Sequence, residues 1–271
     1  MGAVANSSAS VGVLLGSATA ALIDGVLTPE DATAWGWRIP FVMGLFVGLA
    51  GLWLRSGLQE TMPEKSDHAP VKEMMREHLP ALASFAGMAV FNAVPFYIVF
   101  LYVVTWLQNV DGMAPAHALA INSVSIALGI PISLAAGWLS DRFGRRIVCG
   151  TALVAGLILA VPLFRLLHGP DLAMILLGQL GFVLIVGTYA GAQPAMLVEA
   201  APARVRCSIV ALGYNVTLGL LGGMTPLAAQ WLIDRTGIDY IPAHMIIIAA
   251  VISLIALTYL RETYREQLQT A

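Results

Sequence analysis

Eight long apolar stretches limit what this chain can fold into. Each has close to the ~20 residues that an α-helix needs to cross the hydrocarbon layer of a membrane. They are Ser8–Leu27, Trp37–Leu54, Leu79–Leu107, Ala116–Ser140, Ile147–Leu167, Leu172–Val198, Val205–Ile233 and Ile241–Leu260. Inside lipid every backbone amide must find its partner within the segment, and the strands of a membrane barrel would be only about ten residues long and alternating. We therefore predict an all-α polytopic membrane protein with eight transmembrane helices.

The composition supports this class and argues against others. Charged residues make up 11% of the chain, against about 25% in soluble domains. The net charge of −2 and the lack of a basic stripe argue against a nucleic-acid partner. The sequence has no phosphate-binding glycine loop, no nucleophile elbow and no histidine at metal-ligand spacing. We expect no enzymatic activity, no cofactor, no metal site and no disulfide between Cys149 and Cys207.

The lysines and arginines predict the orientation of the spans. If the first loop faces outward, eleven of the fourteen lie in inner loops and the tail, and three lie outside. The inner set is Arg55, Lys65, Lys72, Arg76, Arg142, Arg145, Arg146, Arg204, Arg206, Arg261 and Arg265. The positive-inside rule then predicts a multi-pass protein of the inner (plasma) membrane with both termini in the cytoplasm.

One long hydrophilic connection divides the chain. Residues 1–55 hold two predicted spans, and 56–78 form a mixed-charge cytoplasmic linker. Residues 79–260 hold the remaining six spans as one bundle, and 261–271 form a cytoplasmic tail. The expected partners are the lipid bilayer and small solutes, with no obligate protein partner evident.

A strongly charged turn lies between two of the apolar segments. It reads Gly137-Trp138-Leu139-Ser140-Asp141-Arg142-Phe143-Gly144-Arg145-Arg146. This Gly-x-x-x-Asp-Arg-x-Gly-Arg-Arg pattern between spanning helices resembles the signature loop of the major facilitator superfamily of secondary transporters.

Three further stretches resemble the metabolite:proton symporter branch of that superfamily, which includes carriers of proline and betaine, 2-oxoglutarate, shikimate and citrate. They are Ala34–Phe41, Glu199–Arg206, and Gly213-Tyr214-Asn215 followed by Gly222–Pro226. By this resemblance the eight spans correspond to helices five to twelve of a twelve-helix carrier. The first four helices have no counterpart, so we expect the chain to be a fragment of a carrier.

The resemblance implies transport of a small organic acid or zwitterion by proton-linked alternating access. It also implies a cytoplasmic gate in which Asp141 docks on a helix N-terminus of the other half and the arginines pair with acids of a neighbouring loop. The implied gate residues are Asp141, Arg142, Arg145, Glu199 and Arg206. Alternatively, the arginines serve only as topological anchors.

Large polar side chains at mid-depth in the spans are candidates for a substrate cavity. They are Asn92, Tyr97, Gln193, Tyr214 and Asn215. A polar group in hydrocarbon must face a partner helix or a wet cavity, so hydrogen bonding between helices is the other interpretation. Asp24 is the only acidic residue inside the predicted spans. Because family carriers hold coupling charges largely in their amino-terminal half, the residue that would couple transport to protons is not identified.

Two other function classes stay open. One is a decayed carrier that folds without transporting, or an assembly partner for another membrane protein. The other is a membrane-embedded enzyme, which would need a catalytic constellation that only folding brings together.

Overall fold

The computed structural model describes residues 2–57, 78–169, 171–202 and 205–262. Every regular element in these ranges is helical, and seven helices are long and apolar enough to cross a membrane. The prediction of an all-α polytopic fold is therefore confirmed. The predicted span Ser8–Leu27 falls in α1 (Gly2–Val26), and its crossing of the membrane stays a prediction.

The chain divides into two compact units, residues 9–67 and residues 1–8 with 68–271. The smaller unit contains most of α1, then α2 (Pro29–Ala34), the short turn η1 (Gly36–Arg38) and α3 (Ile39–Ser56). Thr28 caps α2 by accepting a hydrogen bond from the Asp31 amide. The predicted linker 56–78 and the tail 261–271 lie largely outside the described residues, so the predicted division of the chain is not tested.

From residue 78 on, the described part of the larger unit contains six long helical segments, here called rods. The first joins α5 (Leu79–Tyr97), the π-helical turn η2 (Ile98–Tyr102) and α6 (Val103–Asn109). Next come α7 (Pro115–Phe143), α8 (Arg145–Leu167) and α9 (Leu172–Ala200). The fifth rod joins α10 (Arg206–Thr217), the π-helical turn η4 (Leu218–Gly222) and α11 (Gly223–Thr236), and α12 (Ile241–Tyr259) is the last.

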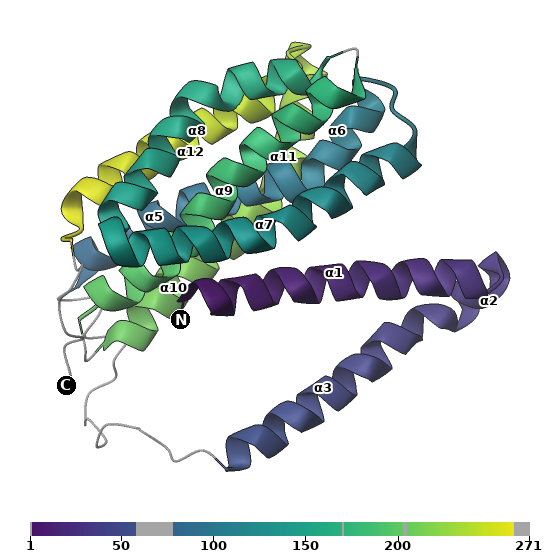
Figure 1. Ribbon diagram of the computed structural model, residues 1–271, viewed down its shortest axis with the longest axis horizontal. Helices are drawn as coiled ribbons and strands as arrows, with labels where there is room; N and C mark the ends of the chain where they lie inside the picture. Colours follow the sequence, from purple (N-terminus) through teal and green to yellow (C-terminus); the bar gives the residue numbers. More distant parts are fainter. Residues whose placement is uncertain (1, 58–77, 170, 203–204, 263–271) are drawn as a thin grey trace. The chain divides into compact units, whose positions relative to one another are not determined.

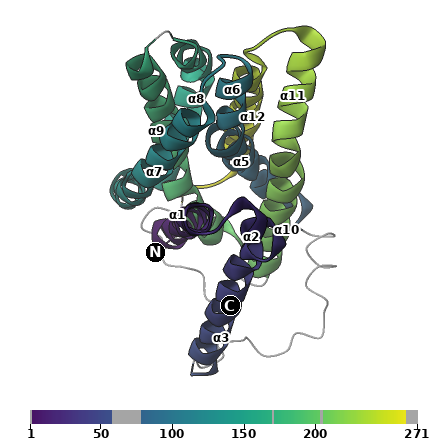
Figure 2. The same cartoon turned by 90° about the vertical axis from the view of Figure 1, so that its right-hand side faces the viewer.

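Helix α9 packs against both α7 and α8, and α12 packs against α5 and α8 (Figure 1). Viewed after a quarter turn, α7, α8 and α9 lie on one side of the α5–α6 rod, and the α10–α11 rod lies on the other (Figure 2). Glycines permit the close approach of α9, because a Cβ at Gly191 would lie 2.2 Å from the Ser133 carbonyl oxygen of α7. On the other side, a Cβ at Gly178 would lie 2.8 Å from the Leu163 carbonyl oxygen of α8.

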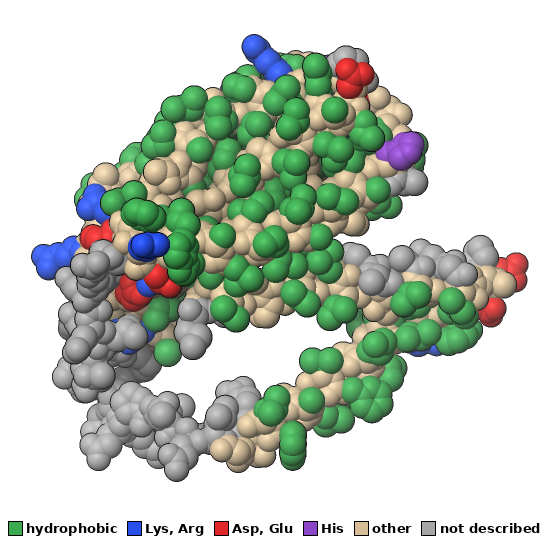
Figure 3. Space-filling model, viewed as in Figure 1, with side chains coloured by type: hydrophobic (Ala, Val, Ile, Leu, Met, Phe, Trp, Pro, Cys, Tyr) green, Lys and Arg blue, Asp and Glu red, His purple; other side chains and the backbone are tan. Residues whose placement is uncertain are grey.

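Aromatic rings fill the centre of this bundle. The rings of Phe91 and Tyr189 meet edge to face at 5.0 Å, as do those of Phe164 and Phe182 at 5.1 Å. Apolar side chains also cover the outer face of α7, α8 and α9, and charged side chains gather towards the ends (Figure 3). An apolar surface of this extent is unusual on a protein surrounded by water and suits a lipid-facing one.

The backbone of α5 is bonded to neighbouring helices at several points. The Ser253 hydroxyl of α12 accepts a hydrogen bond from the Phe91 amide (3.1 Å) and donates one to the Gly87 carbonyl (2.6 Å). The hydroxyl thus bridges an amide and the carbonyl four residues before it, which are the two groups that an α-helical hydrogen bond joins. Pro95 then removes one backbone donor, and η2 follows. Its Val99 carbonyl accepts a hydrogen bond from Gln179 of α9 (2.9 Å).

Candidate functional site

The charged turn between α7 and α8 is built around Gly144. This residue has a φ of 105°, a backbone region that favours glycine. A Cβ at this position would also lie 3.0 Å from a carboxylate oxygen of Glu262. Gly144 therefore lets α7 end at Phe143 and α8 begin at Arg145 within a single residue.

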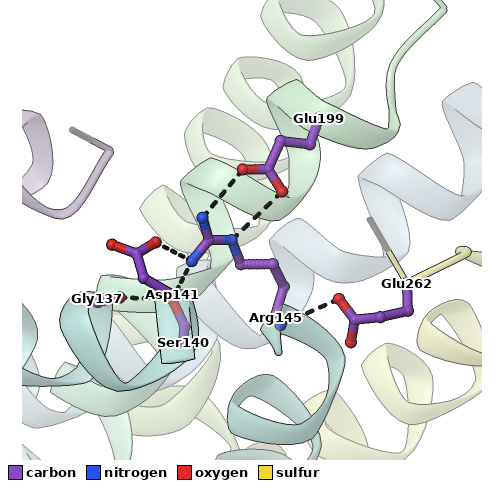
Figure 4. A network of polar contacts seen from close by, with 6 residues as sticks. All are labelled: Gly137, Ser140, Asp141, Arg145, Glu199 and Glu262. Carbon is purple, nitrogen blue, oxygen red and sulfur yellow. Dashed lines mark hydrogen bonds and ion pairs between the residues drawn. The ribbon is translucent and has the colours of Figure 1, made fainter. Parts of the chain in front are cut away.

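Arg145 is the centre of a set of ionic contacts at this turn (Figure 4). Its guanidinium donates two hydrogen bonds to the Glu199 carboxylate at the end of α9, from Nε (3.3 Å) and from Nη2 (3.1 Å). Nη1 donates to the Ser140 hydroxyl (2.9 Å) and pairs with Asp141. The two parallel hydrogen bonds from Arg145 to Glu199 form the bidentate geometry in which arginine binds a carboxylate most strongly.

The two carboxylates that pair with Arg145 differ in their exposure to solvent. The Arg145 side chain is 13% exposed and that of Glu199 is 22% exposed, whereas that of Asp141 is 58% exposed. Solvent screens a charge pair less when both members are sheltered. The link from Arg145 to α9 is therefore the stronger of the two.

Glu262 is a further member that the sequence analysis did not identify. Its carboxylate accepts hydrogen bonds from the backbone amides of Arg145 (3.1 Å) and Arg146 (2.9 Å). These amides open α8, where backbone donors lack helical partners and negative charge is stabilised. The only signal in the sequence was the position of this acid, directly after the last predicted span and on the side where the basic residues gather. We call Ser140, Asp141, Arg145, Glu199 and Glu262 the Arg145 cluster; it joins the ends of α7, α9 and α12 to the start of α8.

The other two predicted gate residues make different contacts. The Arg142 guanidinium lies over the Trp138 ring, 5.3 Å from its centroid. Arg206 donates from Nε to the Ala201 carbonyl oxygen (3.4 Å), within the connection from α9 to α10. The structure thus brings together Asp141, Arg145 and Glu199. Asp141 pairs with an arginine of its own turn, and its docking on another helix stays a prediction.

A cavity of about 760 Å³ opens beside the Arg145 cluster. Its walls come mainly from α7, α9 and α10, with residues 2–4 also in its lining. Most of the lining is apolar, and the polar side chains in it are Ser140, Asp141, Arg145, Glu199 and Tyr214. A volume of this size falls in the range of sites for small molecules. One predicted cavity residue, Tyr214, lines it.

The remaining predicted cavity residues occupy several environments. Asn92 is buried on α5 and donates a hydrogen bond to the Tyr214 hydroxyl oxygen (2.6 Å), so these two lie together. Gln193 is fully buried and donates to the Met88 carbonyl (3.3 Å). Among the described residues its Oε1 has no partner. Tyr97 packs against Gly222, where a Cβ would lie 2.7 Å from the ring.

Asn215 is exposed on α10, in contrast to the neighbouring half-buried Tyr214. The side chain of Asp24 lies outside the part of the chain that the structure describes. Within the described ranges, no group of three or more His, Cys, Asp or Glu side chains could hold a metal ion. Cys149 and Cys207 are free thiols, the first buried and the second exposed.

Comparison with known proteins places this geometry in a family. Residues 2–224 match the family described as Major Facilitator Superfamily. The whole chain aligns, at 30% identity, with a protein of Dickeya dadantii named as the glycine betaine/proline/ectoine/pipecolic acid transporter OusA. It also aligns over its whole length with proteins named as proline/betaine transporters in Salmonella typhimurium (29%) and Escherichia coli K12 (28%).

In each of these alignments the chain spans 57% of the relative's own length. No solved structure matches the chain. The family match and the seven apolar helices together make this a multi-pass membrane protein, and the relatives that it matches are named as transporters. The resemblance seen in the charged turn is confirmed: this chain belongs to the Major Facilitator Superfamily.

Proposed function

We propose that this chain takes part in moving a small zwitterion such as proline or betaine, or a small organic acid, across the cell inner membrane. The observation that carries the proposal is the alignment of the entire chain with proteins named as transporters of proline and betaine. The proposed mechanism is alternating access driven by a proton gradient, in which a bundle tilts about a central substrate site.

The Arg145 cluster, together with Arg142 and Arg206, would form the gate on the cytoplasmic side. Support comes from its position beside the cavity and from the four helix ends that it joins. A gate has to open in each cycle, so its bonds must be strong enough to bias the equilibrium and weak enough to break. Partly exposed ion pairs meet this requirement, since each contributes only about 0.2–1 kcal/mol at an exposed site and more where it is sheltered.

Asn92, Tyr97, Gln193, Tyr214 and Asn215 would form one wall of the substrate site. Asn92 and Tyr214 have the best support, because Tyr214 lines the cavity and Asn92 bonds to it. An amide and a phenol can bind a carboxylate without adding net charge, which suits a zwitterionic solute. Both termini would lie in the cytoplasm, as eleven of the fourteen basic residues indicate.

A second candidate is a non-transporting decayed carrier or an assembly partner for another membrane protein. Support for it comes from Asn92 and Gln193, which are buried and make hydrogen bonds between helices. In this family a substrate site lies between two bundles, and the larger unit supplies one bundle of six spans.

Uptake of radiolabelled proline and glycine betaine into proteoliposomes with an inward proton gradient tests the proposal. The chain would be reconstituted alone and with the part of the Salmonella relative that lies outside the alignment. We expect gradient-dependent accumulation in at least one of these preparations. Arg145→Ala should lower it at least 5-fold, and Arg165→Ala, an exposed arginine near the other end of α8, should leave it unchanged. Correct insertion with no uptake in either preparation would favour the non-transporting alternative.

A further inference from the structure

A second ionic contact lies at the end of the bundle opposite to the Arg145 cluster. Helix α8 begins at Arg145 and ends at Leu167, so it separates the two sites by about 34 Å at 1.5 Å per residue. His168 directly follows α8, and its amide donates to the Phe164 carbonyl (3.1 Å). Asp111 lies in the connection between α6 and α7. The Nδ1 atom of His168 pairs with the Asp111 carboxylate across 57 residues of sequence.

Packing holds the two partners against the ends of other helices. The imidazole lies 6.0 Å from the Trp106 ring of α6 and 6.4 Å from the Tyr240 ring before α12, both edge to face. Trp106 is fully buried, and its indole N–H donates to the Asp239 carbonyl (3.0 Å). The pair therefore joins the α6–α7 and α8–α9 connections where the α11–α12 connection also packs.

The two partners differ in their access to solvent. The Asp111 side chain is 15% exposed, and its second carboxylate oxygen is buried with no partner among the described residues. The His168 side chain is 43% exposed and is open to protons from solution. Burial raises the pKa of the Asp111 carboxyl, and the Asp239 carboxylate raises it further, whereas His168 opposes both effects.

The chemistry of this pair contrasts with that of the Arg145 cluster. A guanidinium stays charged at any pH that a protein meets. An imidazole is the side chain that changes its charge between pH 5 and 8. When the imidazole is neutral, it no longer offsets the charge of an ionised Asp111, which is sheltered from water and repelled by the Asp239 carboxylate. The ionic attraction is then lost, while the cost of a sheltered negative charge remains.

We propose that Asp111 and His168 form a pH-sensitive tie between the α6–α7 and α8–α9 connections, which is tight in mildly acidic solution, where an imidazole is charged, and looser at higher pH, where an imidazole is neutral. The tie acts at the end of the bundle away from the proposed gate. Its existence does not depend on the transport proposal.

Hydrogen–deuterium exchange of the full chain in lipid nanodiscs between pH 5.5 and 8.5 tests the tie without any substrate. After correction for the intrinsic pH dependence of amide exchange, the peptides covering residues 110–118 and 166–169 should open about 1.4- to 5-fold more often at pH 8 than at pH 6. This range is the change expected for the loss of one partly exposed ion pair. The peptides around the Arg145 cluster, 140–147, should show no such change.

Three variants and a control make the test specific. His168→Gln and Asp111→Asn should each give high, pH-independent opening, and His168→Arg should keep the low opening at pH 8. The control is His244→Gln, because this exposed histidine in the first turn of α12 contacts the Tyr240 backbone carbonyl directly before its own helix (2.8 Å). It should preserve the pH response.

Equal opening at pH 6 and pH 8 in the unmodified chain would overturn the proposal, whatever the variants do. A pH response that persists in His168→Gln would overturn it as well.

Discussion

The coupling between Arg145 and its two carboxylate partners can be predicted from their burial and measured by double-mutant cycles. The cycle for the first pair uses Arg145→Gln, Glu199→Gln and the double variant. The cycle for the second replaces Glu199→Gln with Asp141→Asn. Glu199→Gln and Asp141→Asn remove charge at nearly constant side-chain volume, and the shortening at Arg145→Gln is common to both cycles, so that their comparison reports ionic coupling more than packing.

The expected magnitudes follow from the geometry. Exposed ion pairs contribute about 0.2–1 kcal/mol, and breaking a fully buried pair costs about 3–5 kcal/mol. The Arg145–Glu199 pair is mostly sheltered and makes two hydrogen bonds. We expect its coupling free energy to lie between these limits, at about 1–3 kcal/mol. The Arg145–Asp141 pair involves a carboxylate that is 58% exposed, so we expect at most about 1 kcal/mol.

The assay is unfolding of the full chain in mixed micelles of detergent and dodecyl sulfate, followed by circular dichroism. The free energy of unfolding is compared among the wild-type chain and the variants. The reasoning would be refuted if the Glu199 cycle were additive within about 0.5 kcal/mol, or if the Asp141 cycle gave the larger coupling. Either result would mean that burial does not rank these two ion pairs.

Two further results are expected. Gly144→Ala should lower the free energy of unfolding by about 1–3 kcal/mol, because φ is 105° and the new Cβ would lie 3.0 Å from Glu262. The control is Gly150→Ala, where a Cβ would make an ordinary contact at 3.5 Å, and it should change the free energy of unfolding by less than half as much. Equal effects of the two substitutions would contradict the argument. A membrane-impermeant maleimide should label exposed Cys207 only after cells are permeabilised, while buried Cys149 stays unlabelled, and labelling of Cys207 in intact cells would contradict the cytoplasmic placement of the start of α10.

The spans could be predicted from the sequence because lipid imposes one requirement on every residue of a crossing segment. The family resemblance predicted that the arginines of the turn pair with acids of a neighbouring loop, and only the structure identifies Arg145 as the partner of Glu199. The role of Glu262 could not be predicted in this way. It depends on the end of α12 lying beside the start of α8, and no local sequence pattern indicates that proximity. Hydropathy likewise could not separate Tyr214 from Asn215. Successive residues on a helix point about 100° apart, and only packing determines that Tyr214 lines the 760 Å³ cavity while Asn215 is exposed.

The main-chain hydrogen bonds of α5 determine which residues preserve its path through the bundle when the sequence changes in evolution. The Gly87 and Met88 carbonyls and the Phe91 amide of α5, and the Val99 carbonyl of η2 that continues it, are bonded to side chains of α9 and α12. Every residue offers the same carbonyl, so α5 can exchange many of its own side chains and keep these anchors. A change at Gln179, Tyr189 or Ser253 removes an anchor outright. The residues that set the course of α5 through the bundle therefore belong to its neighbours, and evolutionary drift in α9 or α12 would be expected to redirect it.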